Sequence, residues 1–193
     1  MSIEIIKNAL MNSAALKRNI ADTMAEEISR IADIVTSAIK FGNKVMFCGN
    51  GGSAADSQHL AAELVVRLTG KVTRKALPGL ALTTDTSVLT AASNDFGFEN
   101  IFSRQIEATG AEGDILIAIS TSGNSGNVIK AVEAAGGRGI ITVGFLGSGG
   151  GKLGSIVDHP LIVPSDDTQR IQEAHITIGH IIISLVERNF LSV

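Results

Sequence analysis

Three side chains with different acid–base character recur at four-residue intervals in one stretch of the chain. His59, Glu63 and Arg67 lie in a segment with helical character, and residues four apart share one side of a helix. An imidazole and a carboxylate held together can move protons to and from a bound molecule. A solvent-exposed row of salt bridges has the same spacing, so the spacing alone leaves both interpretations open.

A second group of polar side chains lies in the last helical stretch. His180 interrupts an apolar run, and Gln172 precedes it by two steps of four residues on roughly the same stripe. A lone histidine in such a run is commonly a core residue, but a Glu-His pair elsewhere supports a functional interpretation. His175 lies off this stripe, so a structural role or a role in supporting the site residues is predicted for it. His159 precedes Pro160 on a strand and is not expected to be functional.

Two glycine- and serine-rich loops, 49–53 and 120–125, each follow a short apolar run and precede a helical segment. At such a position glycines allow close approach to the backbone, and exposed N–H groups and the helix dipole favour an anion. A tight turn without a ligand explains loop 49–53 equally well, whereas loop 120–125 has more hydroxyls than a turn needs. Neither loop has the G-x-G-x-x-G or Gly-Lys-Ser/Thr pattern, which predicts a sugar phosphate and no nucleotide cofactor. The hydroxyl-poor segment 147–151 is interpreted as a flexible connector.

An acid and a base beside a phosphate anchor suggest proton transfer on a phosphorylated sugar. Moving a carbonyl between C1 and C2 requires removal of a weakly acidic proton and its return to the neighbouring carbon through an enediolate. A carboxylate is suited to that task, an imidazole can relay the hydroxyl proton, and a metal could polarise the oxygens.

Composition excludes several classes of function. Of 193 residues 45% are hydrophobic, which excludes disorder, while the absence of Trp and Tyr and a net charge of −3 argue against nucleic-acid binding. No run is long enough to cross a bilayer, and no signal peptide is visible. The single cysteine, Cys48, ends an apolar run and is expected to be a packed thiol in a reducing cytoplasm. The basic residues Lys71, Arg74 and Lys75 are predicted to form a solvated loop.

The spacing of apolar residues alternates between two patterns along the chain. Strand-like runs lie at 44–48, 79–83, 114–119, 139–145 and 157–163. Helical stretches between them are expected to begin near Ser53, Ser87, Phe98, Ser125 and Asp167. The sequence therefore predicts an α/β fold with a doubly wound, five-stranded, mostly parallel sheet and helices on both faces.

Residues 3–41 precede the first strand and show apolar positions at helical spacing, with Gly42 as the expected stop. We interpret them as an N-terminal helical pair. One small sheet does not cover the apolar faces of such a pair, which indicates packing against a partner subunit.

These motifs, together with Ser93-Asn94-Asp95-Phe96-Gly97-Phe98 and Arg170-Ile171-Gln172-Glu173-x-His175, resemble the phosphoheptose isomerases of the sugar-isomerase (SIS) domain superfamily. The similarity extends over nearly the whole chain. It implies a single SIS domain over residues 1–193, with helices in 1–42 used in oligomer packing and an α/β core in 43–193. It also implies a homotetramer with active sites at subunit interfaces.

The implied reaction interconverts D-sedoheptulose 7-phosphate and D-glycero-D-manno-heptose 7-phosphate, the first step toward ADP-heptose for bacterial surface polysaccharide. By resemblance, Glu63 is the base at C1 and C2 and His180 the acid/base on the oxygens. The implied substrate-binding residues are Asn50, Gly51, Gly52, Ser53, Glu63, Arg67, Asn94, Asp95, Ser120, Thr121, Ser122, Ser125 and Gln172. The implied ligands of one zinc ion per subunit are His59, Glu63, Gln172 and His180.

One position departs from the family pattern. Gln169 stands where some members have a catalytic-pocket aspartate, which leaves a third acid/base role there in doubt. The main rival is a non-catalytic SIS-domain protein that binds a replication initiator or another regulator. Such proteins lack the Glu-His pair that Glu63 and His180 provide here. An isomerase of another ketose phosphate would share the phosphate loop.

Overall fold

The computed structural model describes residues 1–71 and 73–191, so the predicted domain span 1–193 includes three positions, 72, 192 and 193, outside the described residues. Five parallel strands form one sheet in the order β2-β1-β3-β4-β5. The strands are β1 (Val45–Gly49), β2 (Gly79–Ala81), β3 (Ile115–Ser120), β4 (Ile141–Leu146) and β5 (His159–Ile162). All five predicted strands and the parallel α/β fold are thus confirmed. The runs of β1 and β3 are buried throughout, as suits strands covered on both faces.

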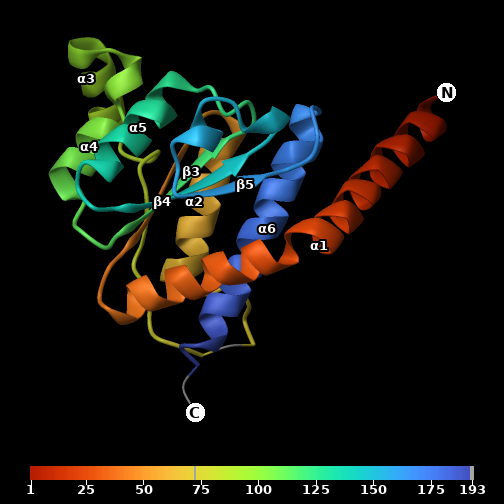
Figure 1. Ribbon diagram of the computed structural model, residues 1–193, viewed down its shortest axis with the longest axis horizontal. Helices are drawn as coiled ribbons and strands as arrows, with labels where there is room; N and C mark the ends of the chain where they lie inside the picture. The colour runs from red at the N-terminus through yellow and green to blue at the C-terminus, as the bar shows by residue number, and fades with distance from the viewer. Residues whose placement is uncertain (72, 192–193) are drawn as a thin grey trace.

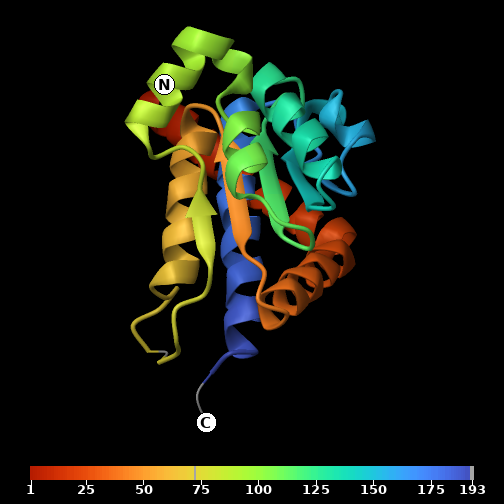
Figure 2. The same cartoon turned by 90° about the vertical axis from the view of Figure 1, so that its left-hand side faces the viewer.

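Helices cover both faces of the sheet, as Figures 1 and 2 show. The α-helices are α1 (Ser2–Lys40), α2 (Gly52–Val65), α3 (Thr86–Phe96), α4 (Ser103–Thr109), α5 (Gly126–Gly136) and α6 (Thr168–Arg188). Short 3-10 turns are η1 (Phe98–Asn100), η2 (Ser148–Gly150) and η3 (Leu153–Ser155). The prediction of a helix that begins near Phe98 is wrong in detail, because only the turn η1 forms there and α4 begins at Ser103.

Alternate residues of each strand contribute to two separate cores. In β1, Val45 and Phe47 pack in the core that α1, α2 and α6 cover, whereas Met46 and Cys48 pack in the core that α4 and α5 cover. This follows from the two-residue period of a strand, which sends successive side chains to opposite faces. Cys48 is fully buried and burial raises the pKa of its thiol to about 12, so the predicted packed, unreactive thiol is confirmed.

The predicted N-terminal helical pair is wrong, because α1 is one continuous helix of 39 residues. Nothing between Ser2 and Lys40 interrupts it, since the segment has neither glycine nor proline. The helix stops where expected, at Gly42, whose φ of +92° suits glycine. The first turns of α1 extend away from the rest of the chain (Figure 1), and their apolar side chains are exposed.

The loop between α2 and β2 also differs from expectation. Lys71 and Lys75 are exposed, but the side chain of Arg74 is fully buried in an ion pair with Glu187 of α6. A buried guanidinium needs an acceptor, and here that acceptor lies 113 positions away in sequence. The local composition therefore did not predict the burial of Arg74. Among the described residues, no helix has both the length and the hydrophobicity needed to span a membrane.

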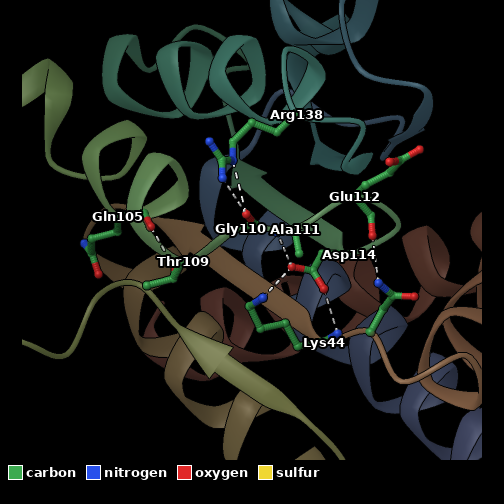
Figure 3. A network of polar contacts seen from close by, with 9 residues as sticks. Lys44, Gln105, Thr109, Gly110, Ala111, Glu112, Asp114 and Arg138 are labelled. Carbon is green, nitrogen blue, oxygen red and sulfur yellow. Dashed lines mark hydrogen bonds and ion pairs between the residues drawn. The ribbon is translucent and has the colours of Figure 1, made fainter.

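Asp114 ties together the amino-terminal ends of the strands (Figure 3). Its carboxylate accepts the backbone N–H groups of Lys44 and Ala111 at 2.9 and 2.8 Å and pairs with the Lys44 ammonium. Burial by itself raises the pKa of Asp114, but the hydrogen bonds and the Lys44 charge outweigh burial and hold the pKa below its usual value. Nearby, Arg138 donates to the Gly110 carbonyl at 3.0 and 3.1 Å. This end of the sheet is therefore a closed polar network.

Candidate functional site

The two predicted loops lie side by side at the carboxyl-terminal end of the sheet. Strands β1 and β3 are neighbours, with Gly49 opposite Ile119, so the loops that follow them are adjacent. In this strand order the connections diverge to opposite faces between β1 and β3, which opens the crevice where α/β sheets bind ligands. Asn50 and the buried Asn127 join the loops by two reciprocal amide hydrogen bonds of 2.8 Å. Sequence reasoning missed Asn127, because only the fold brings its helix beside Asn50.

Both helices that begin at this crevice lack a side-chain cap. Among the described residues, the N-cap positions of α2 and α5 are Gly51 and Ser125, and neither makes a capping bond. By contrast, Asp85 and Asp167 cap α3 and α6. An uncapped N-terminus leaves backbone N–H groups and the positive end of the helix dipole available to an anion. The arrangement suits a phosphate.

The serine loop presents its hydroxyls unequally. Ser120 is buried, and its hydroxyl lies 3.1 Å from that of Ser125. Ser122 is exposed and accepts the Asn124 N–H at 3.2 Å, while Thr121 is half-buried. Ser122 is thus the hydroxyl most open to a ligand, Thr121 and Ser125 are half-buried, and Ser120 supports the loop from beneath.

The glycine-dense segment that was predicted to be a flexible connector packs against the serine loop instead. A Cβ atom at Gly123, whose φ is +65°, would lie 1.9 Å from the Gly150 carbonyl oxygen. The Gly123 carbonyl accepts the Leu153 N–H at 2.9 Å, and Asn124 Oδ1 accepts the Lys152 N–H at 3.0 Å. The glycines allow two backbones to touch, so the segment shapes the loop.

The fold brings His59, Glu63 and His180 together between α2 and α6. Helix α2 carries the first two and α6 the third; the two Nε2 atoms are 2.8 Å apart, and His59 Nε2 lies 3.5 Å from Glu63 Oε1. Glu63 Oε2 is buried without a hydrogen-bond partner. Burial and the neighbouring His59 lower the pKa of His180, against an opposing effect of Glu63. A neutral His180 can both accept and donate a proton near neutral pH.

The donor set suits zinc in kind, although its spacing is tighter than a bound ion requires. Within the described residues, no group of three or more His, Cys, Asp or Glu side chains has a metal-binding arrangement. Two nitrogens bound tetrahedrally to one zinc ion lie about 3.4 Å apart, since each Zn–N bond is about 2.0–2.1 Å. His59 and His180 would therefore separate by about 0.5 Å to share an ion. Imidazole and carboxylate donors fit that chemistry.

Gln172 lies apart from these three side chains in the single chain. Its amide packs on Gly52 at the start of α2, so closely that a Cβ at Gly52 would meet it at 2.0 Å. A shallow hollow of about 330 Å³ beside it is lined by Gln172, Gln169 and Asp56. Asp56 is buried, its Oδ2 has no partner, and burial raises its pKa to about 6, with His59 opposing. Sequence reasoning missed Asp56, although it lies one helical turn before His59.

Three other predicted site residues occupy different surroundings. Helix α2 ends at Val65, so Arg67 does not continue the stripe of His59 and Glu63, and that part of the prediction is wrong. Asn94 donates to Asp95 at 2.7 Å near the end of α3, and Asp95 lines a separate hollow of about 570 Å³ beside β2. A single chain thus leaves Asn94 and Asp95 outside the hollow that Gln172 lines.

His175 is structural, as predicted. It is fully buried, and its Nε2 donates to the Leu146 carbonyl at 3.0 Å. Burial lowers its pKa to about 4 despite that hydrogen bond, so the ring stays neutral near pH 7. It holds α6 against the carboxyl-terminal end of β4.

Comparison with known proteins agrees with this architecture. The family model of the SIS domain matches residues 10–147. The structure of phosphoheptose isomerase from Neisseria gonorrhoeae superposes with a TM-score of 0.91 at 39% identity, covering 97% of this chain and all of that one. Fold and site therefore define a SIS-domain protein.

Relatives of similar sequence identify the family within the SIS-domain class. Phosphoheptose isomerase of Clostridium acetobutylicum is 58% identical over 163 residues, which are 84% of this chain and 82% of that protein. That of Aquifex aeolicus is 51% identical over 185 residues, 96% of each chain. The chain belongs to the phosphoheptose isomerase family of SIS-domain proteins.

Proposed function

We propose that this protein is the isomerase that interconverts D-sedoheptulose 7-phosphate and D-glycero-D-manno-heptose 7-phosphate, the first step toward ADP-heptose. The observation that carries the proposal is the meeting of Glu63, His59 and His180 between α2 and α6, in a chain that also has two uncapped helix N-termini at the β1/β3 crevice. The relatives named phosphoheptose isomerase support it. A regulator-binding role needs no such acid–base cluster.

The chain's residues divide the reaction between phosphate binding and proton transfer. Ser122, Thr121 and the first-turn N–H groups of α5 would bind the phosphate, which places the sugar across the crevice toward α2. The Glu63 carboxylate would take the proton from C1 of the ketose and return it to C2. His180 would give a proton to O2 and take one from O1, so that no net proton is lost.

A zinc ion, one per subunit, would be held by His59, Glu63 and His180, with Gln172 as the further candidate ligand. When bound, it would stabilise negative charge that develops on the substrate oxygens. Both imidazoles must be neutral to coordinate, and the lowered pKa of His180 favours that form.

We also propose that the protein assembles as a homotetramer in the cytoplasm. Exposed apolar side chains of α1, among them Ile3, Ile6 and Leu10, and a hollow of about 230 Å³ between α1 and α6 support self-association. A second subunit could complete the site, which would account for the positions of Asn94 and Asp95. The buried free thiol of Cys48 suits a reducing compartment.

The deciding experiment incubates the purified protein with sedoheptulose 7-phosphate, with and without zinc, and follows the aldose product. We expect turnover, and inhibition by inorganic phosphate. Absence of turnover under every metal condition would contradict the proposal. Light scattering tests the assembly separately: we expect four times the 20.0 kDa chain mass, and loss of assembly on deletion of the residues before Lys44.

A further inference from the structure

The guanidinium of Arg74 is buried beneath the end of α2. The exposed fraction of its side chain is 0%. Its Nη2 donates to the Glu63 carbonyl at 2.8 Å, and its Nη1 donates to the carbonyls of Leu64 and Lys75, both at 2.9 Å. One side chain therefore satisfies two of the last carbonyls of the helix that presents Glu63.

Those carbonyls need a partner because of their place in the helix. Helix α2 ends at Val65, and Val66 departs from helical geometry with φ −94° and ψ −81°. The last carbonyls of a helix have no partner within it, and its last turn tends to fray. Glu63 lies in that last turn, so fraying would move its carboxylate. A cation at this end also complements the negative pole of the helix dipole.

The same guanidinium is anchored to the helix that presents His180. Arg74 Nε donates to Glu187 Oε1 at 2.9 Å, and this oxygen also accepts the Leu68 N–H at 3.2 Å. Glu187 lies on α6, seven residues after His180, which is two helical turns on the same side. The Glu187 side chain is 5% exposed, so water screens this ion pair little.

We propose that Arg74, together with Glu187, is a positioning residue that fixes the separation between Glu63 and His180. The pair joins the last turn of α2 to α6 through the Glu63 carbonyl and the Glu187 carboxylate. This role rests on the proposed function, since it gives Glu63 and His180 their importance. It explains why the protein buries a charge pair where apolar side chains would pack without desolvation cost.

The test compares Arg74→Met, Arg74→Lys and Glu187→Gln with the control Lys44→Met, which breaks the ion pair with Asp114 at the start of β3. Each folded variant is assayed for kcat and KM well below its own thermal midpoint. We expect kcat of Arg74→Met to fall up to about 10²-fold, as a base displaced by about 1 Å would cause, with little change in KM. The kcat of Arg74→Lys should lie between those of the wild type and Arg74→Met, because one ammonium cannot reach all these acceptors. Lys44→Met should lose stability and keep kcat.

A second readout is independent of catalysis. In NMR spectra, the ring proton resonances of His59 and His180 should shift in the Arg74 and Glu187 variants, whereas those of His175 should not. Wild-type kcat with unshifted resonances in Arg74→Met would overturn the proposal, as would an equal loss of kcat in Lys44→Met. If Arg74→Met does not fold, the same outcomes in Arg74→Lys and Glu187→Gln decide. An inactive wild type would instead remove the proposed function, and the resonances would still test the positioning.

Discussion

At the amino-terminal end of the sheet the Asp114 carboxylate has a partner for each oxygen, whereas in helix α2 Glu63 Oε2 and Asp56 Oδ2 are buried without one. Figure 3 shows the first region, where Lys44, Ala111 and Asp114 close a network. A satisfied buried carboxylate stabilises the fold, while an unsatisfied one lowers stability and is free to react. The Asp114 network thus stabilises the fold, while the unpaired carboxylates of α2 are available for chemistry.

The largest effect we expect separates the two regions by their effect on activity. Glu63→Gln should lower kcat by about 10²–10⁴-fold, because the amide keeps the shape and loses the base. Stability should hold or rise, since the replacement removes a buried charge with an unpaired oxygen. Steady-state kinetics and thermal unfolding measure the two quantities. Wild-type turnover in this variant would take Glu63 out of the mechanism.

The reciprocal substitution lies in the Asp114 network. Asp114→Ala should lower the free energy of unfolding by about 3 kcal/mol, because it leaves the Lys44 ammonium and two backbone N–H groups without their acceptor. Denaturant unfolding gives this value, and kcat of the folded fraction should stay at the wild-type level. A selective loss of kcat without a loss of stability would mean that the Asp114 network and the carboxylates of α2 are not separate in function.

Lowering the pH should reduce the free energy of unfolding in two steps, first through His175 and then through Asp114. The pKa of His175 is about 4 in the folded protein, against an ordinary value of 6.5 for a solvated imidazole. Its contribution to stability is therefore complete above pH 6.5 and is lost as the pH falls from 6.5 to 4, by up to about 3 kcal/mol at about 1.36 kcal/mol per unit. Asp114, with a pKa below its usual value, contributes stability that is lost only below pH 3.8.

His175→Gln isolates the first of these transitions, because its amide can still donate to the Leu146 carbonyl. The free energy of unfolding of this variant should fall less than that of the wild type between pH 6.5 and pH 4. Denaturant titrations across this range measure the difference. Parallel pH profiles would show that His175 is protonated in the folded state or exposed to solvent.

The smallest effect concerns single hydroxyls. Ser122→Ala should raise KM about tenfold, since a hydrogen bond to a charged oxygen contributes about 1.5 kcal/mol or more. Thr109→Val removes a hydroxyl at the amino-terminal end, where Thr109 donates to the Gln105 carbonyl at 2.8 Å, and should leave KM unchanged. Equal KM values for the two variants would place the phosphate anchor elsewhere.

Local patterns in the sequence were sufficient for the elements and for the loops. The five strands, the starts of most helices and the glycine stop at Gly42 follow from residue types within a few positions of one another. The loops at 49–53 and 120–125 were placed correctly because a parallel α/β fold puts every such turn at one end of the sheet. His59 and Glu63 share a helix, so their proximity was also predictable.

Tertiary structure alone decided the rest. The meeting of His59 with His180 joins positions 121 residues apart, and the burial of Arg74 against Glu187 joins positions 113 apart. The packing of Gly123 on Gly150 and the pairing of Asn50 with Asn127 depend equally on which loops become neighbours. Spacing along a chain fixes which residues share a helix or strand face. Whether a charged side chain stays in water or is buried against a partner depends on the packing of distant elements, which local periodicity does not encode.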